Sequence, residues 1–161
     1  MITLLGRTRA LTRPEWRVLL EAAALTPLAA AAVRGLPLPK AVDLVLTVAG
    51  CRRRRQAVAA GTSLPSLDRL ATLVEWSASR LRAQCLVQAL VLQAVLRRRG
   101  VCADVVLGAA SGGPAQDRAA SGLLAHAWVE HDGAVLMGAA AVPYVPLCRL
   151  SGDRTGEGAL A

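Results

Sequence analysis

A nearly continuous apolar run over residues 82–100 limits what this chain can fold into. The run reads R-A-Q-C-L-V-Q-A-L-V-L-Q-A-V-L-R-R-R-G, and between its cysteine and its arginines only Gln88 and Gln93 are polar. This length and pattern predict one helix with apolar side chains on nearly every side, which other elements must cover. The closing arginines suit the negative end of a helix dipole, and Gly100 is a typical helix stop. The sequence therefore predicts a central, buried helix.

Cys85 falls in the first turn of this predicted helix. Free N–H groups and the positive end of the helix dipole favour a thiolate there, and the thiolate is the nucleophilic form of cysteine. The competing interpretation is that Cys85 only fills space, because cysteine is among the most buried residue types. By itself the helix favours this second interpretation, so a catalytic role needs a partner elsewhere in the chain.

Composition restricts the partners that the chain can bind. Its 161 residues suit one domain, and Leu, Val and Ala must build the core because phenylalanine is absent. Aromatic residues make up 2% of the chain, which disfavours binding of single-stranded nucleic acid by base stacking. The net charge of +8 would attract an acidic peptide or nucleic acid. A solvated surface explains most of this charge, including the four arginines at residues 52–55.

The cysteines and histidines give no pattern for a metal site. Four cysteines and two histidines are present, and no two cysteines have C-x-x-C spacing, so we expect neither a metal nor a cofactor. Residues 1–10 show no secretory signal, so we expect reduced cysteines and a cytoplasmic protein. The apolar span 18–33 is short for a membrane crossing and contains Glu21 and Pro27. We therefore expect a core or interface helix there.

The first half of the chain predicts helices. Thr12 or Arg13 begins the first helix with Pro14 in its first turn, and Ser66 caps the third helix. Pro27 should kink or end the first helix. The predicted helices cover residues 14–33, 41–49 and 67–78, residues 36–39 form a linker, and residues 61–65 form a break.

The second half predicts a small antiparallel sheet. Short, β-branched segments follow Gly100, and Asp132-Gly133 is a strong hairpin turn signal. The predicted strands cover residues 101–107, 123–131 and 134–137, with a loop over residues 108–122. The fold class is therefore α+β. We expect an N-terminal helical region over residues 1–79, a core over residues 80–150 and a disordered tail over residues 151–161.

His126 lies at the centre of the predicted strand 123–131. Residues alternate between the two faces of a strand, so Leu124, His126, Trp128 and Glu130 share one face, and Ala125, Ala127, Val129 and His131 share the other. If the small residues pack on the helix, His126 and Trp128 face a cleft. A cysteine at a helix start followed by a strand histidine is the arrangement of a papain-type nucleophile and base. The alternative is a histidine that only satisfies a hydrogen bond.

Two segments together carry a specific resemblance. They read C-L-V-Q-A-L-V-L-Q-A-V-L-R-R-R-G-V and A-H-A-W-V-E-H-D-G, and over roughly residues 80–147 the chain resembles the leader peptidases of lasso-peptide biosynthesis. These enzymes belong to the transglutaminase-like, papain-like cysteine-protease superfamily. The resemblance implies a papain-like core with a central helix and a small antiparallel sheet. It also implies ATP-independent removal of the leader from a ribosomally made precursor, with Cys85 and His126 as catalytic residues.

The same resemblance implies partners. These are the leader peptide of the precursor, a separate leader-recognition protein and an ATP-dependent macrolactam synthetase. The apolar and cationic N-terminal half is the surface on which we expect the leader-recognition protein or the leader itself to dock.

The third catalytic residue is where the sequence departs from the family pattern. The resemblance implies a Cys-His-Asp triad, and Asp132 is the nearest acid in the motif. Asp132 lies six residues from His126, roughly 20 Å along an extended strand, at the tip of the predicted turn. The positions opposite His126 across a tight hairpin are about Gly138 and Ala139, and neither carries an acid. Other nearby acids are Glu130 and Asp104. Either another group orients His126, or the protein is a weakened or inactive member.

Two functions of other classes stay open. The missing acid suggests a non-catalytic peptide-binding or scaffold subunit of the same biosynthetic complex. The charge of +8 and the arginine run suggest a basic nucleic-acid-binding protein, for which we would expect salt-dependent binding to DNA. The sequence favours the cysteine peptidase, with neither nucleic acid nor a membrane among its partners.

Overall fold

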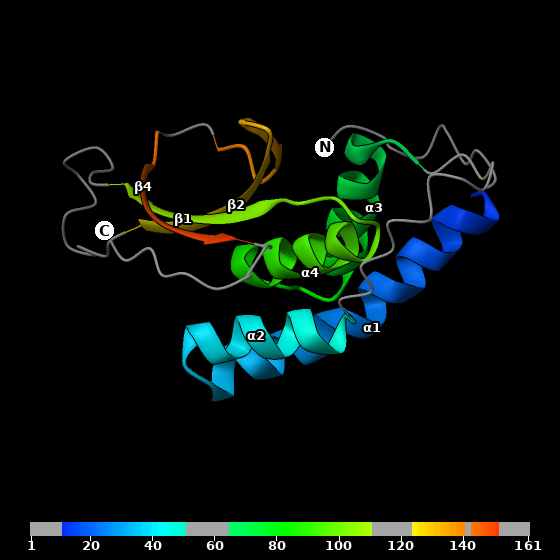
Figure 1. The fold of residues 1–161 in the computed structure, drawn as a ribbon, viewed down its shortest axis with the longest axis horizontal. Coiled ribbons are helices and arrows are strands. Elements are labelled where there is room, and N and C mark those ends of the chain that lie inside the picture. The colour runs from blue at the N-terminus through cyan, green and yellow to red at the C-terminus, as the bar shows by residue number, and fades with distance from the viewer. Residues whose placement is uncertain (1–10, 51–64, 111–123, 141–142, 152–161) are drawn as a thin grey trace.

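The computed structural model describes residues 11–50, 65–110, 124–140 and 143–151. Within these residues four helices precede a four-stranded antiparallel sheet, so the fold is α+β, as predicted (Figure 1). The elements are α1 (Arg13–Gly35), α2 (Leu38–Val48), α3 (Leu67–Arg80), α4 (Cys85–Arg98), β1 (Asp104–Ala110), β2 (Leu124–His131), β3 (Ala134–Met137) and β4 (Val145–Ser151).

Helix α4 is the centre of the hydrophobic core. Every residue from Ala89 to Leu96 is 0% exposed. In Figure 1, α4 lies between the sheet and the pair α1 and α2, and α3 packs on it near one end. The apolar surface all round the helix is thus covered, which confirms the prediction made from residues 82–100.

Gln93 is a polar side chain inside this buried layer. Its Nε2 donates to the carbonyl oxygens of Ala103, at 3.0 Å, and Leu150, at 2.7 Å. The two bonds tie α4 to the start of β1 and to β4. Its Oε1 is buried without a hydrogen-bond partner among the described residues. Both donor hydrogens are used, so the side chain holds the sheet on the helix, whereas the unpaired Oε1 carries a desolvation cost.

The ends of α1 and α3 follow the capping signals of the sequence. Thr12 is the N-cap of α1, and Glu15 accepts bonds from the Thr12 N–H at 2.8 Å and from Arg69 Nε on α3 at 2.7 Å. The Thr12 N–H contributes most, followed by Arg69, and together these contacts lower the pKa of Glu15 to about 2. Ser66 caps α3 by accepting from the Arg69 N–H. One carboxylate therefore joins the start of α1 to α3.

Helix α1 extends through Pro27 to Gly35. Among the described helices it alone is long and apolar enough to cross a membrane by length and composition, a test that core helices also pass. Its inner face buries Val18, Leu19, Ala22, Leu25 and Ala29 in the shared core. Deletion of residues 1–35 would remove part of that core, so it cannot isolate a role in partner binding.

Two boundary predictions were wrong. The linker predicted over residues 36–39 is shorter, because α2 begins at Leu38 and Pro39 lies in its first turn. Proline is tolerated there because the N–H groups of the first turn have no hydrogen-bond partner within the helix. The strand predicted over residues 101–107 runs from Asp104 to Ala110, so Gly108 belongs to β1 rather than to a loop. Strand β1 pairs on both sides, with β2 and β4, and this pairing overrides the low strand propensity of its Gly and Ala residues.

Strand β4 was not predicted at all. It is an edge strand, exposed along most of its length, and it contains Pro146, so it shows no alternation of apolar and polar residues. The arginines at residues 52–55, the break before residue 65 and the tail after Ser151 lie outside the described residues. The division of the chain at residues 79 and 80 stays a prediction.

The sheet has the order β3-β2-β1-β4, and its register positions the candidate site. Gly108 of β1 pairs with His126 of β2, and Val106 pairs with Trp128. Ala127 and Val129 point into the core that contains α4. His126, Trp128 and Glu130 therefore occupy the opposite face of β2, as the alternation in the sequence predicted.

Candidate active site

Cys85 is the first residue of α4. The N-cap residue, Gln84, makes no side-chain capping bond, so no side chain of the N-cap competes for the N–H groups of the first turn. The Cys85 side chain is half-buried and packs against the edge of the core. Its position at a helix start combines a thiol with free backbone donors that can stabilise an oxyanion.

The imidazole of His126 is held by a backbone carbonyl. Its Nε2 lies 2.8 Å from the Gly138 oxygen, which can only accept a hydrogen bond. Nε2 therefore carries the proton, and in the neutral ring Nδ1 is the basic nitrogen. The rings of Trp128 and Tyr144 flank the imidazole with centroids 6.2 Å and 5.1 Å away. These contacts fix both the tautomer and the orientation of His126.

A cavity of about 370 Å³ opens at this histidine, on the sheet face away from α4. His126, Trp128 and Tyr144 line it, together with Pro143 and Pro146. The Trp128 ring lies over β1 at Gly108, which has no side chain. A Cβ at this position would be 2.6 Å from the ring. The cleft that the sequence predicted at His126 and Trp128 is therefore present.

Cys85 and His126 lie at the same end of the helix-and-sheet layer. Helix α4 leads directly into β1, which returns alongside it, and β2 is antiparallel to β1, so α4 and β2 run in the same direction (Figure 1). Cys85 begins α4, and His126 is the third residue of β2. Cys85 does not line the His126 cavity, however, and within the described residues no hydrogen bond joins the two side chains. Their catalytic pairing stays a prediction.

Asp132 lies at the tip of the turn between β2 and β3. Its φ is 49°, its side chain is 89% exposed, and its carboxylate is 3.4 Å from Nε2 of the neighbouring His131. The Asp132 carboxylate thus lies beside His131, whereas the group at Nε2 of His126 is the Gly138 carbonyl. These contacts are those of a turn residue, and a role of Asp132 in orienting His126 remains a prediction.

We expect Asp132→Asn to change turnover by less than about tenfold. Asn-Gly forms the same turn, and loss of a true orienting aspartate costs about 10,000-fold because the wrong tautomer is favoured. Single-turnover cleavage of the precursor measures the difference. A loss near the larger figure would show that Asp132 reaches His126 during catalysis.

Glu130 is occupied by other partners. Its carboxylate accepts from Trp128 Nε1 at 2.7 Å and pairs with Arg149 at 2.7 Å. The Trp128 bond, and after it Arg149, hold the pKa of Glu130 below its ordinary value. Trp128 lies between Glu130 and His126 along the strand. Glu130 therefore fixes the indole that lines the cavity and does not orient the imidazole.

Position 138 accepts no side chain without a shift of the backbone. Gly138 has a φ of 83°, and a Cβ there would stand 3.0 Å from the Ala127 oxygen and 3.0 Å from Trp128 Cβ. An acid at this position would displace the carbonyl that contacts His126. The neighbouring Ala139 also lines the cavity and is exposed, so it is the unstrained position that faces the histidine.

Sequence reasoning missed two parts of this site. The Gly138 carbonyl is a backbone group, and no residue type indicates that its carbonyl will contact a histidine. The sequence had only placed Gly138 about opposite His126 across a tight hairpin. Tyr144 follows the third strand, in a segment that was not assigned to any element. The sequence does single out this residue, because it is the chain's one tyrosine and lies between prolines in P-Y-V-P.

Among the residues that the structure describes, the remaining thiols and acids do not form a metal site. Cys102 and Cys148 are exposed and free. Within the described ranges, no group of three or more His, Cys, Asp and Glu side chains is placed to hold a metal ion.

Comparison with known proteins identifies a family match. Residues 20–148 match the family model Transglut_core3, described as the transglutaminase-like superfamily. The match runs from α1 into β4 and includes both Cys85 and His126. No similar curated protein and no similar solved structure was found.

Proposed function

The chain belongs to the transglutaminase-like superfamily, and from this premise we propose that it is a cysteine peptidase that removes the leader from a lasso-peptide precursor. The superfamily suggests the papain-like class of cysteine proteases, and the helices and small sheet fit a papain-like core. The leader-peptidase assignment is supported by the two resembling segments. The observation that carries the proposal is Cys85 at a helix start, with a tautomerically fixed His126 at the same end of the layer.

In the proposed reaction, Nδ1 of His126 takes the proton of the Cys85 thiol, and Sγ attacks the scissile carbonyl. The N–H groups at the start of α4 stabilise the oxyanion. The imidazolium then gives its proton to the departing amine, and the leader remains as a thioester. A water that loses its proton to Nδ1 attacks this thioester, releases the leader carboxylate and restores the thiol. These steps use no metal, cofactor or ATP.

The Gly138 carbonyl takes the orienting part that an aspartate has in a triad. It holds the Nε2–H, but a neutral acceptor stabilises an imidazolium less than a carboxylate does. We therefore propose slower turnover than in an enzyme with a full triad. The reaction also requires Sγ and Nδ1 to come within about 3 Å. Because His126 lies on the face of β2 turned away from α4, this step requires the imidazole to turn toward the start of α4 when substrate binds.

The proposal includes the location and the partners of the enzyme. Cys85, Cys102 and Cys148 are free thiols, which suits a reducing compartment such as the cytoplasm. The partners are the precursor leader, a separate leader-recognition protein and the macrolactam synthetase that would use the released core peptide.

Alkylation and cleavage together test the proposal. We expect the protein with Cys51, Cys102 and Cys148 replaced by alanine to cleave a precursor in the presence of its leader-recognition protein, with a free leader carboxylate seen by mass spectrometry. Treatment with iodoacetamide should add one adduct, on Cys85, and stop cleavage because the nucleophile is blocked. Full alkylation of Cys85 with undiminished cleavage would contradict the cysteine-peptidase mechanism.

One observation favours a second candidate, a subunit that binds the peptide without cutting it. Cys85 does not line the cavity at His126, and the described contacts of His126 include no acid. The aromatic and proline walls of that cavity suit an extended peptide. This candidate predicts precursor binding that is unaffected by alkylation of Cys85, with no hydrolysis at any enzyme concentration.

A further inference from the structure

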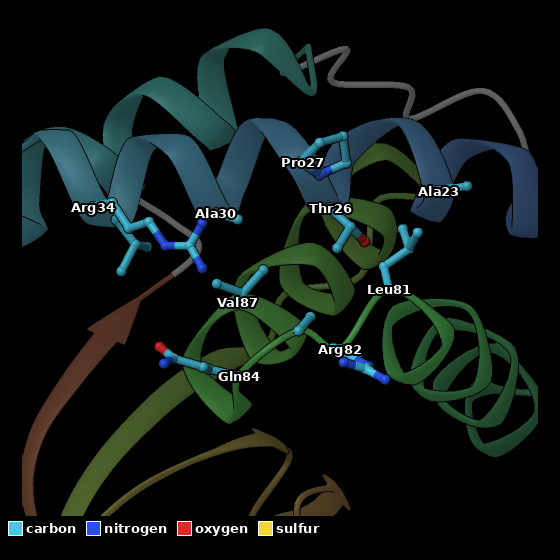
Figure 2. Close-up of a pocket in the computed structure, with 11 residues that line it drawn as sticks. Ala23, Thr26, Pro27, Ala30, Arg34, Leu81, Arg82, Gln84 and Val87 are labelled. Carbon is cyan, nitrogen blue, oxygen red and sulfur yellow. The ribbon is translucent and has the colours of Figure 1, made fainter.

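A second cavity, of about 290 Å³, is lined by chain neighbours of Cys85 but not by Cys85 itself (Figure 2). One wall is α1 and the other is the segment that leads into α4, so Ala83 and Gln84 line it immediately before Cys85. Its inner surface is mainly apolar, and Pro27 on α1 and Val87 on α4 are among the residues that line it. It is thus a concave, apolar space within two residues of the thiol.

Two arginines stand at this cavity. In Figure 2, Arg34 extends from α1 so that its guanidinium lies between α1 and Val87, and Arg82 lies on the far wall. Within the described residues neither forms an ion pair with a carboxylate, whereas Arg69, Arg98, Arg99 and Arg149 each do. The cavity therefore combines apolar walls with two cations that have no acidic side chain beside them.

The backbone gives no reason for an arginine at position 82. Helix α3 ends with a bond from the Ala83 N–H to the Ala78 oxygen and one from the Arg82 N–H to the Ser79 oxygen. Arg82 directly follows the C-cap residue of α3 and has a φ of 52°. Glycine is the usual residue at this position of a helix end. A side chain is disfavoured in this conformation. Arginine nevertheless occupies this position, where it lines the cavity.

We propose that this cavity binds an acidic segment of the leader, on the acyl side of the scissile bond. An apolar side chain would fill the space at Pro27 and Val87, and a neighbouring carboxylate would pair with Arg34 and Arg82. The inference rests on the proposed peptidase function, because the acyl side must stay bound while the thioester forms and is hydrolysed. The volume suits one or two side chains, and the charge is complementary to an acidic peptide.

Three variants test this subsite. Arg82→Gly removes the guanidinium and gives the backbone the residue that it favours, so the melting temperature should equal or exceed that of the wild type. Arg34→Gln removes the second cation. Arg17→Gln is the matched control, because Arg17 is exposed on the same helix, does not line the cavity and changes the net charge equally.

Binding of a fluorescent leader peptide is measured in a Cys85→Ala background, which keeps the readout independent of cleavage. We expect Arg34→Gln and Arg82→Gly each to weaken binding by about tenfold at low salt, and Arg17→Gln to change it by less than twofold. Replacing the leader's acidic residues one at a time by their amides should identify one position at which the Arg34→Gln effect disappears.

Equal binding by all three variants would overturn the subsite. The same result with normal cleavage in the Cys85 protein would leave the peptidase function standing. Charge-dependent leader binding without any cleavage would instead retain the subsite and reject the peptidase.

Discussion

Replacing Cys85 with alanine should abolish cleavage of the precursor. The substitution removes the atom that forms the thioester, and loss of a catalytic nucleophile typically lowers kcat by more than about 1,000-fold. The fold should survive, because the thiol is only half-buried and alanine is the best helix former. Cys85→Ser should behave in the same way, since a hydroxyl is a far weaker nucleophile than a thiolate at neutral pH.

The measurement is mass spectrometry of the precursor over time, with circular dichroism to check folding. Cys102→Ala and Cys148→Ala are the matched controls, because both side chains are exposed and free and neither residue belongs to α4. These variants should keep nearly full activity. Unchanged cleavage by folded Cys85→Ala would refute the enzyme proposal outright.

Replacing His126 with alanine should have the next largest effect. It removes the proposed base, and a positioned general base contributes about 100- to 10,000-fold to a rate. The loss should be in kcat more than in KM, since Trp128 and Tyr144 still line the cavity. Added imidazole should recover part of the activity, because the deleted ring leaves a space between these two aromatic residues.

His131→Ala is the matched control on the same strand. Its imidazole contacts the Cys102 carbonyl and the Asp132 carboxylate, away from the cavity, so its loss should have little effect on turnover. Equal losses in the two histidine variants would indicate a structural role for the strand. Full activity of His126→Ala would show that another group deprotonates the thiol.

The helices could be predicted closely because their signals are local. The Ser66 cap and the spacing of Leu70, Leu73 and Val74 place α3, and the apolar run places α4 with Cys85 at its first residue. The hairpin from β2 to β3 follows from Asp132-Gly133. A helix cap, a hairpin turn or a helical spacing of apolar residues depends only on residues that are close in sequence. These features can therefore be predicted without knowing what packs nearby.

The sheet edge could not be predicted in the same way. The last residues of β1 are Gly and Ala, and β4 is exposed and contains a proline, so neither segment resembles a strand. The end of β1 is a strand because β2 and β4 pair with it on both sides, and β4 is a strand because β1 supplies its hydrogen-bond partners. Strand formation here depends on a neighbour that is distant in the chain.

From the sequence we could predict that Cys85 lies in the first turn of a buried helix and that His126 and Trp128 share one face of a strand, because helix periodicity and strand alternation are local. The structure was needed to show that the Gly138 carbonyl holds His126 and that Arg34 and Arg82 line one cavity. The reason is physical: a backbone carbonyl is the same in every residue, and two side chains far apart in the chain come together only through the packing of α1 on α4.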